Sequence, residues 1–234
     1  MRSLALLDRA SRLAERHLKR YGQAAPASTT YKIPELLPHP VTWAEDVLGV
    51  HLDPWQQELV TSSAISMIAA CARQVGKTEA IIVAVAYQLM HFPGLVVILA
   101  NGDRTAGEIF ARVRDALSRA GASISSSDDN KRSCSLREPR SRLLALPAAP
   151  KTVRGIAGVR LLILDEAAFM PPELFAAVEP MVAAAGGRTI YASSPNGQLG
   201  RFWDLWSMSD IPRVQVAAYD CPRISHEFLE QQRQ

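Results

Sequence analysis

The chain has 234 residues, 48% of them hydrophobic, and a formal net charge of +3. This length and composition indicate one α/β domain with small additions, and the mild charge does not by itself predict a nucleic-acid partner. Three widely separated cysteines without a CxxC pair indicate neither a disulfide framework nor a zinc site. No signal peptide and no membrane-length apolar run is visible. We therefore expect a soluble protein of the cytoplasm without a membrane partner.

The N-terminal part, residues 1–41, is predicted to lie outside the main domain. Residues 3–20 have the spacing of an amphipathic basic helix, and residues 22–41 are a proline-rich linker. The basic helix has either a solvated face or a face that binds DNA or a partner. The main domain is expected over 42–222. It begins with a helix capped by Thr42, followed by a helix that Asp53 caps.

The segment from Cys71 to Thr78, CARQVGKT, lies between two apolar runs. A strand, a tight loop and a helix in this order are the context of a phosphate-binding loop. Backbone N–H groups at the helix start attract an anion, and Gly76 lets the backbone approach it. Lys77 is then placed to reach the β- and γ-phosphates of ATP, and the Thr78 hydroxyl to bind Mg²⁺. Cys71 replaces the first glycine of the usual motif, so a helix start without a ligand is the alternative.

A second motif is Leu161–Glu166, LLILDE. Four apolar residues followed by two acids predict a buried parallel strand whose carboxyl end carries the acids. Ligands of doubly wound sheets bind at that edge. Asp165 is placed to hold Mg²⁺. Glu166 is placed to deprotonate the attacking water, a role worth roughly 10²–10⁴ in rate. A strand that ends in solvated acids is the alternative.

Other polar groups are expected near these motifs. A strand over 189–193 ends in Ser193-Ser194-Pro195-Asn196, which adds a polar turn at the same sheet edge, although a plain serine-rich turn is the alternative. Gln56, just before the first strand, is the candidate for hydrogen bonds to the adenine edge, and an exposed helix-start glutamine is its alternative.

The remaining segments predict a mostly parallel sheet with helices between its strands. The polar stretch 121–142 predicts a hairpin or an edge strand, and 151–155 a loop. Further strands are expected over 94–100, 142–146 and 213–219, with helices over 103–120, from Pro171 to Gly186, over 199–206 and after Ser225.

Taken together, these residues resemble the ATPase domain of the large terminase subunit of tailed bacteriophages, the motor that packages DNA into the procapsid. The match covers roughly residues 42–232, in family order. That family has a variant phosphate-binding loop with Arg-Gln, as in Arg73-Gln74, and without the first glycine. The matching segments are Pro54-Trp55-Gln56, Arg73–Thr78, Arg154-Gly155, Leu164–Ala167, Ser193–Gly197 and Phe202–Trp206.

The resemblance implies a P-loop NTPase fold of the ASCE, RecA-like class, with ATP and Mg²⁺ as cofactors. It implies that Arg73 contacts phosphate in cis and that an arginine of the next subunit completes the site. Arg154 is the candidate for that arginine finger and Arg160 its rival, with a structural or DNA-contacting role as the alternative for both. The implied sets are ATP-binding Gln56, Arg73, Gln74, Val75, Gly76, Lys77 and Thr78; metal-binding Thr78 and Asp165; catalytic Glu166, Arg73 and Arg154; and coupling Ser193, Ser194, Pro195 and Asn196.

The implied partners are double-stranded DNA, the portal, the small terminase subunit and further copies of the chain. Family members form a ring on the procapsid in the host cytoplasm, usually a pentamer, and a monomer in isolation is the alternative. They usually carry a C-terminal RNase H-like nuclease. No acidic metal cluster of that kind is visible here, so nuclease activity is not expected, and residues 223–234 are interpreted as the start of the helix leading to it.

Basic residues are the candidates for DNA contact, because phosphate contacts give sequence-independent, salt-sensitive binding. Solvated charge that balances nearby acids is the alternative. The candidates are Arg112, Arg114, Lys131 and Arg132.

The leading hypothesis is an ATP-hydrolysing DNA translocase. A helicase-like or remodelling ATPase is the alternative enzyme, and it would need a second RecA-like lobe. A nucleotide-dependent assembly switch with little turnover is the alternative from another class, and Glu166 argues against it because a switch needs no base. A kinase would need an acceptor pocket and a lid.

Overall fold

The computed structural model describes residues 37–125, 131–208, 210–221 and 224–231. The predicted helix over 3–20 and most of the linker lie outside these residues. Helices and strands alternate through the described part, and their order is α2 (Pro40–Leu48), α3 (Pro54–Thr61), β1 (Ser66–Cys71), α4 (Lys77–His91), β2 (Gly94–Ala100), α5 (Asp103–Arg119), β3 (Ser133–Leu136), β4 (Ser141–Pro147), α6 (Pro150–Val153), β5 (Val159–Asp165), η1 (Ala167–Phe169), α7 (Pro172–Ala183), β6 (Arg188–Ser193), α8 (Gly200–Ser207), β7 (Arg213–Val216), η2 (Ala218–Asp220) and α9 (His226–Gln231).

Seven strands form one sheet in the order β3-β4-β2-β5-β6-β1-β7. All neighbouring strands are parallel except β3 and β4, which pair antiparallel. The predicted mostly parallel sheet is therefore confirmed, and the stretch 121–142 contains the predicted edge strand. Because the strands are parallel, β1, β5 and β6 bring their carboxyl ends to one edge.

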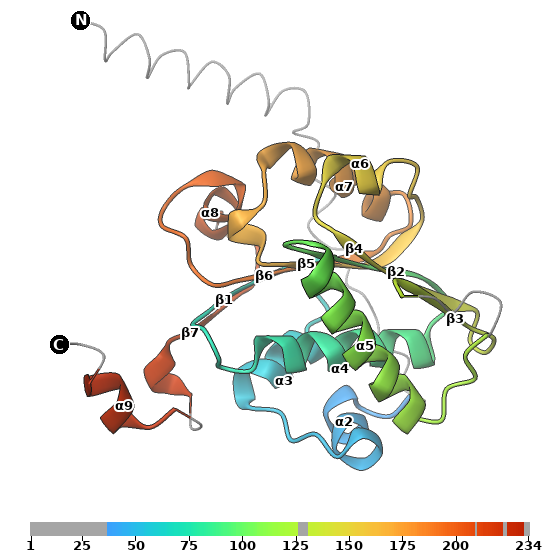
Figure 1. Ribbon diagram of the computed structural model, residues 1–234, viewed down its shortest axis with the longest axis horizontal. Helices are drawn as coiled ribbons and strands as arrows, with labels where there is room; N and C mark the ends of the chain where they lie inside the picture. The colour runs from blue at the N-terminus through green and yellow to red at the C-terminus, as the bar shows by residue number, and fades with distance from the viewer. Residues whose placement is uncertain (1–36, 126–130, 209, 222–223, 232–234) are drawn as a thin grey trace, which may run out of the picture.

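Helices cover both faces of the sheet (Figure 1). Helices α2, α3, α4 and α5 pack on one face, and α6, α7 and α8 on the other. Alternate residues of each strand face opposite layers. In β5, for example, Ile163 belongs to the core on the α4 side, and Leu162 and Leu164 to the core on the α7 side.

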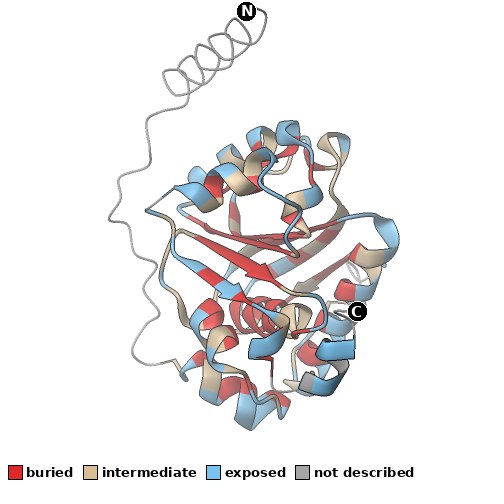
Figure 2. Ribbon diagram, turned by 90° about the vertical axis from the view of Figure 1, so that its left-hand side faces the viewer, coloured by how far each residue is buried: buried red, intermediate tan, exposed pale blue. Residues whose placement is uncertain are grey.

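Burial distinguishes the central elements from the outer ones. Figure 2 shows buried strands between helices whose outer faces are exposed. Every residue of α4 from Ala80 to Leu89 is buried. A helix that is apolar all round belongs inside a domain. It therefore gives the loop before it a rigid support.

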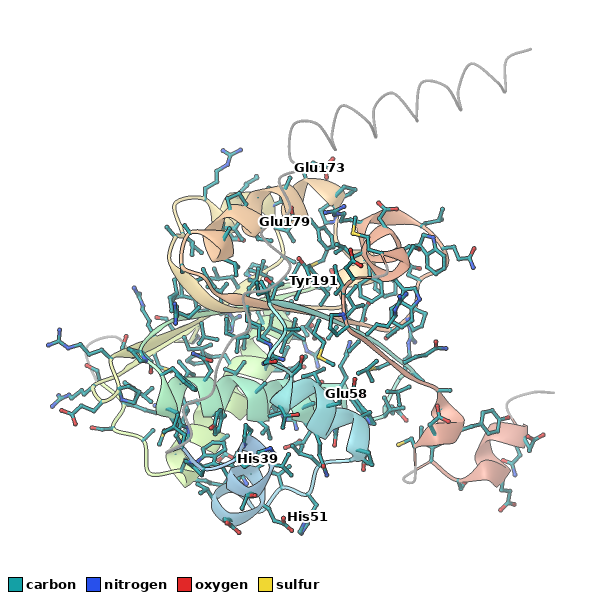
Figure 3. The ribbon with its side chains drawn as sticks, turned by 180° about the vertical axis from the view of Figure 1, so that it is seen from behind. His39, His51, Glu58, Glu173, Glu179 and Tyr191 are labelled. Atoms are coloured by element: carbon teal, nitrogen blue, oxygen red, sulfur yellow. The ribbon has the colours of Figure 1, made fainter. Side chains whose placement is uncertain are left out.

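The α7 layer has its own packing against the sheet. Figure 3 shows Tyr191 in the sheet, with Glu173 and Glu179 on the α7 side. The Tyr191 ring stacks on Phe175 of α7, with 6.0 Å between ring centroids. Glu179 forms an ion pair with Arg201 of α8 at 3.1 Å. These contacts join α7 and α8 to the strand whose end carries Ser193.

Three boundaries differ from the predictions. Helix α2 begins at Pro40 after His39, so Thr42 is not its N-cap, because proline suits the first helical turn. Residues 151–153, expected as part of a loop, belong to the short helix α6, which begins at Pro150. Strand β7 ends at Val216, before Tyr219. Among the described residues, no helix is long and apolar enough to cross a membrane.

Candidate nucleotide-binding site

The loop between β1 and α4 has the backbone of a phosphate-binding loop. Gly76 precedes the helix with φ 95° and ψ 19°, a left-handed conformation that glycine adopts without strain. Gln74 also has a positive φ, 65°. Cys71 is the last residue of β1, is buried and pairs with Val216 of β7. It lies in an ordinary strand, and this explains why the first glycine of the usual motif is dispensable here.

The two predicted acids meet the loop lysine. Asp165 ends β5 and is buried, and Glu166 follows it with φ 60°. The Lys77 ammonium lies 3.1 Å from Asp165 Oδ1 and donates a hydrogen bond to Glu166 Oε1. Lys77 and Glu166 are 89 residues apart in the sequence, yet the fold brings their side chains into contact.

Glu166 is also bound by the turn after β6. Its Oε2 accepts hydrogen bonds from the Ser194 N–H at 3.0 Å and the Ser193 hydroxyl at 3.2 Å. Burial alone would raise the pKa of Glu166. The hydrogen bond and charge of Lys77, with the bonds from Ser194 and Ser193, outweigh burial and lower that pKa. The carboxylate is therefore ionised at neutral pH, as a general base requires.

Asp165 has the opposite balance. Burial raises its pKa, and the positive charge of Lys77 only partly opposes this. Its Oδ1 is buried and makes no hydrogen bond to the described residues, although the Lys77 ammonium is near. A buried carboxylate oxygen with spare capacity suits Mg²⁺, which protein sites hold through one or two carboxylates together with substrate phosphates. Among the described residues there is no cluster of three or more histidine, cysteine, aspartate or glutamate side chains that could hold a metal ion.

A cavity of about 590 Å³ opens beside these groups. This volume lies within the usual range for ligand pockets, roughly 300–1,000 Å³. It is lined by Ala72, Arg73, Gln74, Gly76, Lys77, Thr78, Glu79, Asn101, Arg112, Glu166, Phe169 and Ser194. The cavity therefore collects most of the residues assigned to ATP, with Thr78 at the start of α4 and Glu166 opposite.

Gln56 lies outside this cavity. It is buried, and its side-chain NH₂ donates to the carbonyl of Gly76 at 2.8 Å. Its Oε1 accepts from the N–H of Asp53 at 2.7 Å, which completes the cap of α3. The side chain thus supports the phosphate-binding loop from behind. The adenine contact stays a prediction, and this arrangement does not provide it.

The coupling residues lie beside the catalytic acid. The Ser193 hydroxyl accepts from the N–H of Ala168 at 3.1 Å, and the Asn196 side chain donates to the carbonyl of Ala168 at 3.4 Å. Pro195 is exposed. The turn after β6 and the turn after β5 are therefore joined through Ser193, Asn196 and Glu166.

The arginines predicted for catalysis occupy different places. Arg73 lines the cavity. Arg154 is exposed at the end of α6 and does not line it. Its rival Arg160 lies near the start of β5, away from the edge that carries the acids, and donates to the Ala185 carbonyl at 2.5 Å. Arg160 therefore has a structural role in this fold.

The residues predicted to contact DNA differ in their surroundings. Arg132 is bound to Asp103, with nitrogen–oxygen distances of 2.6 and 3.0 Å. Arg112 lines the nucleotide cavity and pairs with Glu79. Arg114 and Lys131 are exposed. DNA contact stays a prediction, and Arg112 and Arg132 are already paired with acids of the chain.

Besides Ala72 of the loop itself, three cavity residues were not among the predicted site residues. Asn101 follows β2, whose partner is β5, so it reaches the edge beside Glu166. Glu79 is in the first turn of α4, and Phe169 ends η1. The pairing of β2 with β5 would have identified Asn101, but strand order is not readable from a local sequence pattern. Glu79 could have been found from its place after the Gly-Lys-Thr motif.

Comparison with known proteins identifies the fold. No protein-family model matches the sequence, and no curated protein matches it. The ATPase domain of the Thermus phage P74-26 large terminase matches with a TM-score of 0.75 and 23% identity, over 84% of this chain and 93% of that one. The HK97 large terminase matches with a TM-score of 0.64 and 18% identity, over 80% of this chain and 44% of that one.

Two further structures extend the comparison. The large terminase of a thermophilic bacteriophage, in complex with ADP, matches with a TM-score of 0.62 and 13% identity, over 78% of this chain and 50% of that one. The chain thus spans about half the length of this thermophilic-phage terminase and of the HK97 protein. The UvsW helicase of bacteriophage T4 matches less well, with a TM-score of 0.51 and 10% identity, over 72% of this chain and 61% of that one.

Proposed function

We propose that this chain, which has the fold of phage large-terminase ATPase domains, hydrolyses ATP and couples hydrolysis to the movement of double-stranded DNA into a procapsid. The observation that carries the proposal is the contact of Lys77 with Asp165 and Glu166 beside a cavity of nucleotide size. The thermophilic-phage terminase, with the same fold, has been solved with ADP and with ATP-γ-S. The portal, the small terminase subunit and a ring of copies belong to the same proposal.

The proposed reaction uses the residues of the cavity as follows. The triphosphate attracts Lys77 away from the carboxylates, which frees Glu166 to accept a proton. The water oxygen forms a bond to the γ-phosphorus as the bond to the bridging oxygen of ADP breaks, and the water proton passes to Glu166. Thr78 and Asp165 would hold Mg²⁺ together with the phosphates, and the bound ion would neutralise part of the phosphate charge. Arg73 adds positive charge from the loop.

The first test removes the base. Glu166→Gln keeps the size of the side chain and its contacts with the serines but cannot accept the proton. We expect ATP turnover to fall roughly 10²–10⁴-fold with ATP binding retained, measured by phosphate release and by titration with a fluorescent ATP analogue. Glu173→Gln, at an exposed position of α7, is the control. Turnover at the wild-type rate in Glu166→Gln would overturn the proposed chemistry.

Coupling to DNA needs its own test. The double variant Ser194→Ala, Asn196→Ala removes one hydrogen bond to Glu166 and one to Ala168. We expect slower DNA translocation per ATP consumed, because the turn after β6 no longer follows the state of the catalytic acid. An unchanged translocation rate would exclude this turn as the coupling element.

A helicase-like ATPase is the second candidate, favoured by the match to UvsW. Duplex substrates separate the two functions. A packaging motor displaces a bound third strand from a duplex without separating its strands, whereas a helicase releases one strand.

A further inference from the structure

Arg112 lies at the nucleotide cavity. It is on α5, whose residues Ile109, Val113 and Ala116 are buried in the core beneath α4 and α5. This packing turns Arg112 to the cavity, which it lines together with Glu79 and Asn101. Arg114, two positions on, lies on another face of the same helix, because a step of two residues rotates about 200° around a helix axis.

Arg112 has a defined partner in the same cavity. Its Nη2 atom lies 2.5 Å from Oε2 of Glu79, and the two side chains are 50% and 33% exposed. Glu79 is in the first turn of α4, directly after the residues that bind phosphate in the proposed function. A carboxylate at that place repels a polyphosphate unless a cation offsets its charge. Arg112 supplies that cation.

The charges of the cavity argue for a second role of Arg112. Among the lining residues the cations are Arg73, Lys77 and Arg112, and the acids are Glu79 and Glu166. Lys77 is already shared between Asp165 and Glu166. Even with Mg²⁺ bound, a triphosphate together with Glu79 and Glu166 would bring more negative charge than Arg73 and Lys77 can balance alone. A half-exposed guanidinium at the same cavity presents further donors, in a geometry that matches phosphate oxygens.

We propose that Arg112 is a nucleotide-binding residue, which contacts the phosphates of ATP from α5, and that Glu79 positions it when the nucleotide is absent. The inference rests on the proposed function and assigns Arg112 to the nucleotide rather than to DNA. It also means that the nucleotide contacts α5, the helix that carries Arg114.

The test is equilibrium binding of a fluorescent ATP analogue with Mg²⁺ to the full chain and its variants. Arg112→Ala is expected to weaken binding roughly 10- to 100-fold, because hydrogen bonds to a charged group are lost. Arg112→Lys should recover part of the loss. The matched control is Arg104→Ala, also an arginine of α5 paired with a glutamate, Glu108 at 2.8 Å, but outside the cavity. It should bind ATP as the wild type does.

The double variant Arg112→Ala, Glu79→Gln distinguishes two roles of Arg112: direct contact with phosphate, and neutralisation of the negative charge of Glu79. If Arg112 contacts phosphate, the double variant still binds ATP more weakly than Glu79→Gln alone. Equal affinity of these two variants would overturn the contact, because Arg112 then only masks Glu79. Wild-type ATP affinity in Arg112→Ala, with weaker duplex binding in fluorescence anisotropy, would assign Arg112 to DNA and overturn the inference. Failure of the wild type to bind ATP would overturn the proposed function instead.

Discussion

Lys77 is the residue on which the candidate site depends. Its ammonium is shared between a buried aspartate and a glutamate whose other oxygen is held by Ser193 and Ser194. An ammonium between two carboxylates lowers the cost of burying both negative charges. In the proposed reaction the same ammonium binds the phosphates, so Lys77 stabilises the two acids when ATP is absent and contacts ATP when it is bound.

The pH dependence of stability follows from this arrangement. With Lys77 present, the pKa of Glu166 is lowered, so its contribution to stability is complete above its unfolded pKa and is lost as pH falls through the folded pKa. Burial already raises the pKa of Asp165, and without Lys77 nothing from its charge would oppose burial at Asp165 or Glu166, so the pKa values of both acids would move upward. Folded protein would then bind protons more tightly than unfolded chain, and stability would increase as pH falls.

The variant Lys77→Met tests the direction of this pH dependence of stability. In metal-free buffer at neutral pH we expect a loss of about 3 kcal/mol in unfolding free energy, because two acids lose their cation. The difference from wild type should shrink as the pH falls and the two acids take up protons. Denaturant unfolding across this range measures it, with Lys151→Met at an exposed position as the control. A difference that does not change with pH would contradict the assignment.

The elements β5 and β6 act together at the site. They pair in register, with Asp165 opposite Ala192, so Glu166 and Ser193 follow side by side. Their two turns are joined by the hydrogen bonds of Ser193, Ser194 and Asn196. A change in the hydrogen bonds of Glu166 therefore changes the contacts of the turn after β6.

The other end of this strand pair depends on Gly187. A Cβ atom there would lie 2.2 Å from the carbonyl oxygen of Val159 and 3.0 Å from Arg160 backbone atoms. Backbone cannot move aside as a side chain can, so Gly187→Ala forces β5 and β6 apart. Overpacking of this kind costs about 1–3 kcal/mol.

We therefore expect Gly187→Ala to lower the unfolding free energy by about that amount, measured by thermal and denaturant unfolding. Gly107→Ala is the matched control. Its Cβ would meet only the flexible end of Arg132, and alanine is favoured over glycine inside a helix. Equal stability of Gly187→Ala and wild type would show that the strand pair is not closely packed there.

At the scale of the whole molecule, the proposed site is open to a partner. The cavity is lined by residues of β1's loop, α4, α5 and the turns after β2, β5 and β6, while Arg154 lies exposed outside it. Phe169 is 43% exposed at the same cavity. An arginine finger from a second copy would complete such a site in trans, in agreement with the proposed ring.

Turnover at different protein concentrations tests the ring. We expect the rate per subunit to rise with concentration for wild type. We expect Arg154→Ala to lose roughly 10³–10⁵-fold in turnover while it still binds ATP, because the finger stabilises the transition state. Mixing inactive Arg154→Ala with inactive Glu166→Gln should restore part of the activity if each copy lends its arginine to the next. A flat rate per subunit with a fully active Arg154→Ala would instead indicate a complete site within one chain.

Local patterns were enough to predict the strand, loop and helix around Gly76, the acidic strand and the mostly parallel sheet. Apolar runs, the Gly-Lys-Thr helix start and the position of Asp165 and Glu166 depend on neighbours in the chain, so their chemistry is visible in the sequence. The cap of α3 was predicted for the same reason. Thr42 was misplaced as a cap because a proline two residues earlier also starts a helix.

Contacts between distant segments were decided only by the tertiary structure. Gln56 is bonded to the carbonyl of Gly76, and Arg112 lies in the cavity, because α3 and α5 pack against α4. Asn101 reaches the acids because β2 pairs with β5. Such contacts depend on strand order and helix packing, which sum many weak interactions over the whole chain and leave no local pattern. The motifs therefore determine which chemistry is available, and the packing determines which side chains take part in it.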